Sequence, residues 1–399
     1  MKAALIFREH LLDSTDRFVL DQAKLLRSYR PVLVGLLPAD SGLNDSIPAI
    51  LLRNGQSPIN KAAVNLYRKL PIAPGFFQRL RTVKPAVIHA QSAADAPQAL
   101  TIARVLDLPL IVSLRLLDVI PGDGAPPAGI ASRGFGGNRK RLFQEAAAFV
   151  CPSRFIRDAA TKAGFPESRL HVHQMGIDCQ RFSDADQERD PKLILFVGSL
   201  VQKKECEYLL RAMSLLQRHD PEARLEIIGD GPLRSRLESI AASLSLHASF
   251  RGAQDAAEVS RSLSRARVLC NPSMAATSGD MEGLCMAFAE AQAAGTPVVS
   301  SSDSATAETV SHGHTGLLCP EGNVFALADS LRALLNDDVL WTSISNCARE
   351  WASVRFDIVK RTASLEMLYD ECVAARSRRG SRAPEQAAWS AHTESPLNT

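Results

Sequence analysis

The chain has 399 residues, of which 46% are hydrophobic and 22% charged, a composition typical of a globular protein in water. No apolar run approaches the roughly 20 residues that a membrane-spanning helix needs, and the N-terminus lacks a secretory signal pattern, so we expect a cytoplasmic protein. The length exceeds what one ordinary core serves and predicts about two domains of roughly 150 to 200 residues each.

The net charge of +3 conceals an asymmetry between the two halves of the chain. Residues 1–180 carry a net charge of +9, which leaves −6 for the remainder. A basic half without regular aromatic interleaving favours an acidic substrate or a phospholipid surface over nucleic acid, and a solvated basic face is the alternative. The eight cysteines are scattered without zinc-binding spacing, which predicts small core residues in a reducing compartment.

The first half contains a series of short apolar runs, each followed by a helical pattern. Near-continuous hydrophobicity over four to seven residues indicates strands covered on both faces, and their alternation with helices predicts a parallel sheet. The runs are KAALIF at 2–7, PVLVGLL at 31–37, PAVIHAQ at 85–91, PLIVSL at 109–114 and AAFVCPS at 147–153.

A polar stretch at 179–191 interrupts this pattern and suggests an interdomain linker, after which a second strand series begins with KLILFVGSL at 192–200. We therefore predict an α/β protein with two Rossmann-like domains that face each other across a cleft. The predicted segments are a first domain at 1–182, a second at 183–355, a helix at 356–375 that packs back on the first domain, and a disordered tail at 376–399.

Glu290 is the only charged residue in the predicted helix from Leu284 to Ala294. A buried carboxylate without a partner costs several kcal/mol, so the residue requires either a hydrogen-bonding partner within its own domain or a ligand. Glu282 lies eight residues earlier, about 12 Å along a helix axis, which is comparable to the span of a nucleotide-sugar. A helix N-terminus near Gly283 and Leu284 would offer free amides to an oxygen-rich ligand.

This segment, MEGLCMAFAEAQAAGTPVVSS, resembles the E-x7-E signature of the family 4 retaining glycosyltransferases, and the resemblance extends over nearly the whole chain. It implies the GT-B fold and a nucleotide-sugar donor. By the resemblance, Glu282 lies near the donor sugar's hydroxyl groups and Glu290 binds the ribose. The amides of Gly283 and Leu284 face the donor.

The stretch FVGSLVQKKECEYLLRAM is similar to the family element in which an Arg and a Lys hold the donor diphosphate. Lys204 matches the lysine, with Lys203 beside it, whereas Ser199 replaces the arginine and Glu205 replaces the following glycine. Two cations would stabilise a diphosphate leaving group, and a solvated loop is the alternative for these lysines. Gly198 and the glycine of IIGDGPL, Gly231, complete the predicted donor-binding set.

The first half resembles the subgroup that builds bacterial exopolysaccharide repeat units, through the stretches at 14–26, 87–119 and 151–182. Arg115 stands where the subgroup has a catalytic-site histidine, and it cannot act as an acid or base near pH 7. It would bind an acidic sugar or the diphosphate, or form a salt bridge with Asp118. Asp118 and His173 are acceptor-side candidates, with a cleft position expected for His173, while a buried hydrogen-bonded role is expected for His89.

The sequence therefore predicts transfer of a hexose to a saccharide acceptor, with retained configuration and with Glu282, Lys204 and Arg115 as candidate catalytic residues. We expect no cofactor. We also expect no metal, because the DAD at 184–186 lies in an acidic linker rather than at a strand end and the family that the chain resembles is typically metal-independent. The basic and aromatic stretch at 60–85 suggests peripheral association with the inner membrane face and a lipid-linked acceptor, with a solvated helix as the alternative. The changes at Ser199 and Arg115 keep open a non-catalytic subunit that supports a partner enzyme, and a nucleotide-sugar epimerase is a third candidate.

Overall fold

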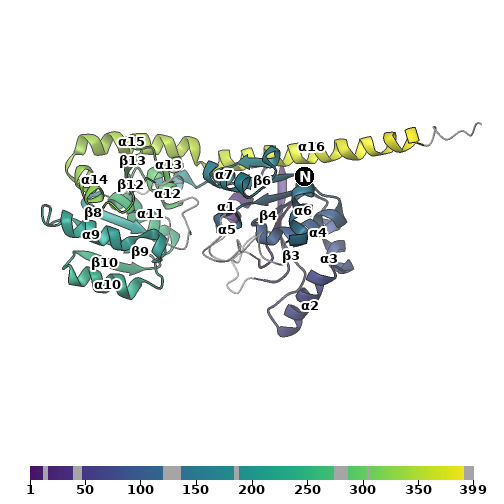
Figure 1. Cartoon of the computed structure of the whole chain (residues 1–399), viewed down its shortest axis with the longest axis horizontal. Helices are drawn as coiled ribbons and strands as arrows, with labels where there is room; N and C mark the ends of the chain where they lie inside the picture. The colour runs from purple at the N-terminus through teal and green to yellow at the C-terminus, as the bar shows by residue number, and fades with distance from the viewer. Residues whose placement is uncertain are drawn as a thin grey trace, which may run out of the picture.

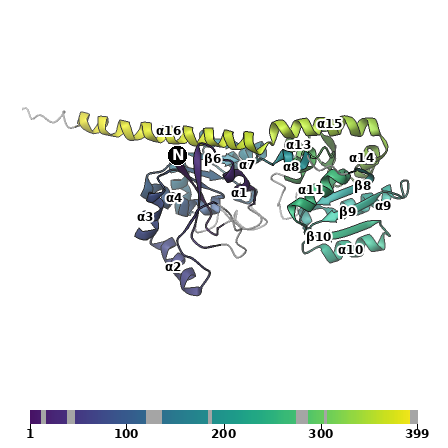
Figure 2. The ribbon, with the colours of Figure 1, turned by 180° about the vertical axis from the view of Figure 1, so that it is seen from behind.

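The computed structural model describes residues 1–11, 17–38, 47–119, 136–183, 188–273, 286–302 and 306–390. Two parallel β-sheets lie side by side, each surrounded by helices, and one long C-terminal helix passes along the first of them (Figures 1 and 2). The predicted fold class, two Rossmann-like domains with a helix that returns to the first, is confirmed.

The first sheet has seven strands in the order β3-β2-β1-β4-β5-β6-β7, and every pairing is parallel. Its strands are β1 (Lys2–Phe7), β2 (Tyr29–Gly35), β3 (Ala49–Leu51), β4 (Pro85–Ala90), β5 (Leu110–Ser113), β6 (Ala148–Cys151) and β7 (Leu170–Val172). The helices between them are α1 (Arg17–Lys24), α2 (Pro58–Lys69), α3 (Pro74–Thr82), α4 (Ala96–Leu106), α5 (Leu116–Val119), α6 (Gly136–Glu145) and α7 (Arg154–Lys162).

The apolar runs of this sheet are buried on both faces, as their near-continuous hydrophobicity predicts. In β1, Leu5 and Phe7 pack into the core shared with α3 and α4, whereas Ala4 faces the C-terminal helix. Leu5 aligns with Val32 on one side and with Ile88 on the other, so the centre of the sheet is a continuous apolar layer.

The second sheet has six parallel strands in the order β10-β9-β8-β11-β12-β13. They are β8 (Asp190–Val197), β9 (Arg224–Ile228), β10 (Ala248–Gly252), β11 (Ala266–Asn271), β12 (Val298–Ser301) and β13 (Gly316–Cys319). Around them lie α8 (Cys179–Ser183), α9 (Cys206–Leu216), α10 (Arg234–Ser243), α11 (Ala256–Arg265), α12 (Met286–Ala293), α13 (Thr306–Thr309), α14 (Val324–Asn336) and α15 (Asp338–Arg355).

The chain passes between the domains at two adjacent points. Ile177 donates its N–H to the carbonyl of Phe356 at 2.7 Å, and Ile358 donates to the carbonyl of Ile177 at 2.9 Å. Gly176 allows this approach, because a Cβ there would lie 2.5 Å from the Cα of Ile358. The crossing precedes the predicted linker and the predicted boundary at 182, since α8 already packs on the second domain through Phe182.

The C-terminal helix α16 (Ile358–Ser390) covers one face of the first sheet with Leu365, Leu368, Tyr369 and Cys372. The Glu366 carboxylate accepts the backbone N–H groups of Arg27, Ser28 and Tyr29 at 2.8, 2.7 and 3.2 Å, which fixes the helix on the sheet. The helix continues beyond the domain (Figure 1), so the prediction of disorder from residue 376 is wrong for 376–390. Arg376 pairs with Asp107 on the domain, which stabilises the helix just beyond residue 375.

Candidate functional site

The carboxyl ends of β8 and β9 meet in two glycine-containing turns of the second sheet. Gly229 has φ +140°, and a Cβ there would lie 1.9 Å from the carbonyl oxygen of Gly198. Gly231 is equally constrained, since its Cβ would lie 2.6 Å from the carbonyl oxygen of Leu200. Only glycine permits this packing of backbone on backbone, which brings Gly198, Ser199 and Gly231 to one edge of the sheet.

Lys204 reaches the same edge. It ends a 3₁₀ turn, Gln202–Lys204, and its side-chain carbons lie 3.5 to 3.7 Å from the position of a Cβ on Gly198. The aliphatic stem therefore lies over Gly198, as is common for a lysine that keeps its ammonium group in a polar environment. Lys203 lies in the same turn, and its side chain is outside the described part of the structure.

Glu205, directly after Lys204, has φ +47°, a left-handed conformation. The family has a glycine at this position, and glycine adopts that conformation without strain. Glu205 thus adopts a backbone conformation that a glycine would adopt without strain.

Asn271 joins the ends of β8 and β11, and it was missed from the sequence. Its side-chain amide donates to the carbonyl of Val197 at 2.8 Å, and its oxygen accepts the N–H of Val197 at 3.3 Å. This fully buried residue fixes the spacing of the two strands beside Gly198. Its position as a polar residue at the end of the apolar run ARVLCN could have identified Asn271 from the sequence.

Glu290 lies in α12, whose Phe288, Ala289 and Ala291 are buried in the core of the second domain. Its carboxylate has no hydrogen bond or ion pair with any residue that the structure describes. Burial raises the pKa of Glu290 to about 7, and the positive charge of Arg181 on α8 opposes that shift. The candidates Glu282, Gly283 and Leu284 fall in 274–285, outside the described residues.

At the carboxyl edge of the first sheet, Asp118 holds together two loops. Its carboxylate accepts the backbone N–H of Arg115 at 2.7 Å and that of Ala93 at 3.2 Å. Burial nevertheless raises the pKa of Asp118 to about 6, against the effects of these hydrogen bonds and of the Arg115 charge. The structure thus places the candidates Arg115 and Asp118 together, directly after β5.

A second carboxylate on this edge, Asp95, was not identified from the sequence. It accepts hydrogen bonds from the Arg8 guanidinium at 3.1 Å, the Ser92 hydroxyl at 2.6 Å and the Glu9 N–H at 2.9 Å. These contacts join the ends of β1 and β4, and Glu9 also pairs with Arg68 of α2. Polar residues directly after the apolar runs at 2–7 and 85–91 were the signal.

Two histidines of the first domain, His89 and His173, lie under α16. His173 is nine-tenths buried and hydrogen-bonds through Nε2 to the carbonyl of Arg361 at 2.8 Å, so the expectation that it faces a cleft is wrong. His89 contacts the Tyr369 hydroxyl at 2.8 Å and the Ser113 hydroxyl at 2.9 Å, which confirms a satisfied buried histidine. Burial lowers the pKa of both rings, that of His89 to about 3, with the neighbouring His173 charge adding to it.

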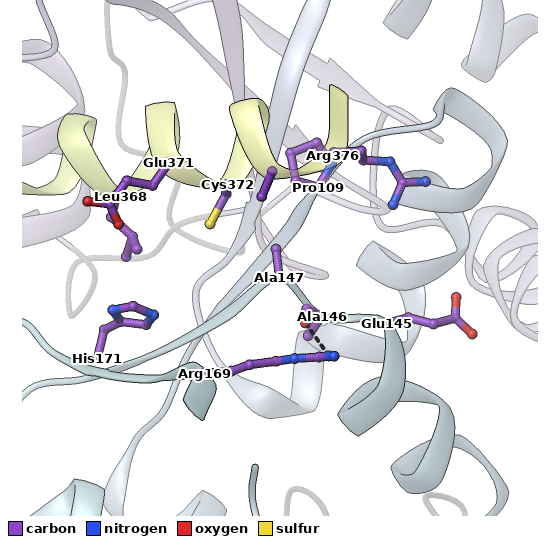
Figure 3. A pocket seen from close by; sticks show the side chains of 11 residues that line it. Pro109, Glu145, Ala146, Ala147, Arg169, His171, Leu368, Glu371, Cys372 and Arg376 are labelled. Carbon is purple, nitrogen blue, oxygen red and sulfur yellow. Dashed lines mark hydrogen bonds between the residues drawn. The ribbon is translucent and has the colours of Figure 1, made fainter. Parts of the chain in front are cut away.

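A pocket of about 210 Å³ lies between α16 and the amino ends of β5, β6 and β7, opposite the edge that carries Asp118 (Figure 3). Arg169, which lines this pocket, donates to the carbonyl of Ala146 at 2.8 Å and to those of Phe143 and Gln144. It therefore caps the C-terminus of α6. Arg376 pairs with Asp107 and Glu145 with Arg104. Because its two arginines and Glu145 are used in structural contacts, we do not assign this pocket to the site.

Models of known protein families match both halves of the chain. Residues 17–181 match the family model described as Glycosyltransferase Family 4, and residues 180–351 match that described as Glycosyl transferases group 1. The amylovoran biosynthesis glycosyltransferase AmsK of Erwinia amylovora is 31% identical over 221 residues, which cover 54% of each chain. The putative colanic acid biosynthesis glycosyltransferase WcaL of Escherichia coli is 34% identical over 176 residues, 43% of each chain.

The chain thus spans about half the length of the curated relatives that it matches. Among solved structures, HepE of Anabaena in complex with UDP aligns over 93% of this chain and 100% of its own, with a TM-score of 0.70 and 18% identity. A glycosyltransferase of Rickettsia africae aligns over 93% and 99%, with a TM-score of 0.73 and 16% identity. These two likenesses show the fold.

Proposed function

Because this chain belongs to the family 4 glycosyltransferases with the GT-B fold, we propose that it transfers a hexose from a nucleotide-sugar to a saccharide acceptor in the synthesis of an exopolysaccharide or related glycan. The observation that carries the proposal is the carboxyl edge of the second sheet. There the glycine turns bring the backbone of two strands together beside Lys204, and α12 presents a half-buried carboxylate, Glu290, that is not hydrogen-bonded within the described residues.

In the proposed complex, the nucleoside diphosphate lies across this edge. The Glu290 carboxylate accepts hydrogen bonds from the ribose hydroxyl groups, which relieves the cost of its burial. The ammonium group of Lys204, with Lys203, neutralises the diphosphate, and Ser199 contributes a hydroxyl where an arginine is usual. Glu282 and the amides of Gly283 and Leu284 hold the sugar.

We propose that the configuration at the anomeric carbon is retained and that the reaction needs no metal. The acceptor oxygen attacks the anomeric carbon as the bond to the diphosphate breaks, and the leaving diphosphate takes the acceptor's proton on the same face. Lysine charges and helix amides stabilise the charge that develops on the diphosphate. Turnover in the presence of EDTA should therefore equal that in its absence.

The acceptor in this proposal lies against the first domain, where Arg115, Asp118, Arg8 and Asp95 follow neighbouring strands. Arg115 in place of the usual histidine favours an acidic sugar or a phosphate on one of the substrates. His173 has no part in this site, since its ring is buried under α16.

A lipid-linked acceptor is supported by α2 and the turn after it, which project from the body (Figures 1 and 2). This segment carries large apolar side chains that are 57 to 80% exposed, next to exposed lysines: Ile59, Leu66, Leu70, Ile72, Lys61 and Lys69. Such a surface suits the headgroup region of an anionic membrane. No helix in the described ranges has both the length and the apolar character to span a bilayer. Loss of vesicle flotation in Ile59→Asp/Ile72→Asp would support the proposal.

The direct test is turnover. The protein is incubated with UDP-, GDP-, ADP- and TDP-sugars and candidate glycan acceptors, and the product's anomeric configuration is read by NMR. One donor class should give product with the donor's configuration. Nucleotide binding without turnover of any donor would instead favour the non-catalytic subunit.

A further inference from the structure

A second cavity, of about 490 Å³, lies where the two domains meet, beside the crossing at Ile177 and Asp357. The first domain contributes the start of α7 and β7, the second contributes α13 and the end of α15, and the start of α16 lies between them at the crossing. The polar residues that define it are Arg154, Arg157, His171, Gln174, Glu308, Arg355 and Arg361. Arg154 and Gln174 follow the carboxyl ends of β6 and β7 in the first sheet, beyond the residues described above for that edge.

Glu308 is the one carboxylate among the described residues that line this cavity, and it is already hydrogen-bonded to the backbone. Glu308 of α13 accepts the backbone N–H of Arg154 at 2.7 Å and that of Phe155 at 2.6 Å. It thereby occupies the N-terminus of α7, where the Ser153 hydroxyl accepts the N–H of Ile156 at 3.2 Å. The hydrogen-bonding capacity of Glu308 is thus directed at neutral amides rather than at the surrounding guanidinium groups.

Three of the four guanidinium groups have no ion pair with a described residue, whereas Arg157 pairs with Asp158 at 2.7 Å. Arg355 stacks on Trp351, with its Cζ 4.5 Å from the ring centroid, which fixes its position without neutralising it. The Nε of Arg361 is buried and has no acceptor among the described groups. A buried donor without an acceptor is uncommon in proteins and indicates a partner supplied from outside.

The arginines also repel one another across the domain boundary. Burial lowers the pKa of Arg355, and the positive charge of Arg154 from the other domain lowers it further, as does that of Arg361. Glu308 counteracts this shift only in part. Three positive charges thus face one negative charge, and an anion with two negative charges would balance them.

We propose that this cavity binds a phosphate-class oxyanion, held by Arg154 from the first domain, by Arg355 from the second and by Arg361 at the start of α16. Planar guanidinium groups match phosphate oxygens in pairs, and the cavity is large enough for a diphosphate. Because the ligand contacts both domains beside the crossing, it fixes their relative orientation. The source is either free phosphate or diphosphate, or a phosphate group on a lipid, and the site acts independently of the donor at the second-sheet edge.

The test uses calorimetric titration of inorganic pyrophosphate at constant ionic strength into the full-length Lys204→Ala protein, so that the proposed donor position contributes little. We expect this protein to bind pyrophosphate. Its affinity should fall at least about fivefold when either Arg154→Gln or Arg355→Gln is introduced as a second substitution, since each removes charged hydrogen bonds. Arg261→Gln, at an arginine paired with Glu258 on α11, is the matched control and should change nothing.

Arg154 is exposed, so its replacement should leave the fold intact, which a thermal melt of each variant verifies. Equal affinity in all variants, or no binding at millimolar pyrophosphate, would overturn the proposal. Loss of affinity in Arg154→Gln alone would refute the contact to both domains. Geranyl diphosphate distinguishes the sources: much tighter binding than pyrophosphate indicates a lipid-linked phosphate, and equal binding indicates the free anion.

Discussion

The carboxyl edges of the two sheets differ in how their polar groups are used. On the first edge, the carboxylates of Asp95 and Asp118 accept hydrogen bonds from neighbouring loops, so they hold the backbone in place. On the second edge, glycine turns hold the backbone, and the Glu290 carboxylate has no hydrogen bond within the described residues. The framework of the second edge needs only glycine backbone and the buried Asn271 side chain, which leaves the Glu290 carboxylate for a ligand.

The largest effect should come from Gly229→Ala, which disrupts the packing of the two glycine turns at the second edge. The new methyl group would lie 1.9 Å from the carbonyl oxygen of Gly198, on a residue with φ +140°. We expect a loss of about 3 kcal/mol or more in the free energy of unfolding, measured with urea. Gly313→Ala is the control: its φ is +73° but nothing lies within 4 Å, so about 1 kcal/mol should be lost. Equal losses would contradict the close packing of the two turns.

Lys204→Ala should lower the rate of donor turnover by about 100-fold, because it removes a cation from the leaving diphosphate. Its free energy of unfolding should change little, since the stem lies on the surface of Gly198. Lys162→Ala, at an exposed lysine on α7, provides the matched control and should keep full activity. Normal turnover by Lys204→Ala would remove the lysine from the donor site.

Glu290→Gln should lower nucleotide affinity about tenfold at pH 8 and flatten its pH dependence. In the wild type, affinity should rise with pH through about 7, as the carboxyl group ionises and accepts more strongly from the ribose. The raised pKa means that the folded protein holds this proton more tightly than the unfolded chain, so unfolding free energy falls as pH rises from about 4.5 to 7. Nucleotide titrations at pH 6 and 8 check the affinity, and urea unfolding at pH 4.5 and 7 checks the stability. An unchanged pH dependence in Glu290→Gln would count against the role of this carboxyl group.

The smallest effect concerns Glu205→Gly, which should stabilise the fold by about 0.5 to 1 kcal/mol. The residue has φ +47°, and burial already raises the pKa of its carboxyl group. Ser245→Gly, at φ +52° on the far side of the domain, should give a similar gain in urea unfolding and no change in nucleotide binding. A loss of stability in Glu205→Gly would show that the Glu205 side chain has a structural role.

Much of the fold could be predicted from the sequence, because doubly covered strands need continuous apolar runs such as 2–7 and 192–200. The solitary charge of Glu290 in an apolar helix could also be recognised. The polar residues after the runs at 2–7 and 85–91 were a signal for Arg8 and Asp95, but their pairing could not be predicted, since it joins strands that are far apart in the sequence. His173 was misplaced for a related reason: α16, nearly two hundred residues later, covers it.

Thermal unfolding with UDP, GDP, ADP and TDP, each repeated for Glu290→Ala, tests the donor site most directly. A nucleotide at 100 times its dissociation constant adds about 2.7 kcal/mol to the stability of the protein that binds it. We predict that one nucleotide class raises the melting temperature of the wild type and that the rise disappears in Glu290→Ala. No rise with any nucleotide, or an equal rise in the variant, would contradict a donor site at the second-sheet edge.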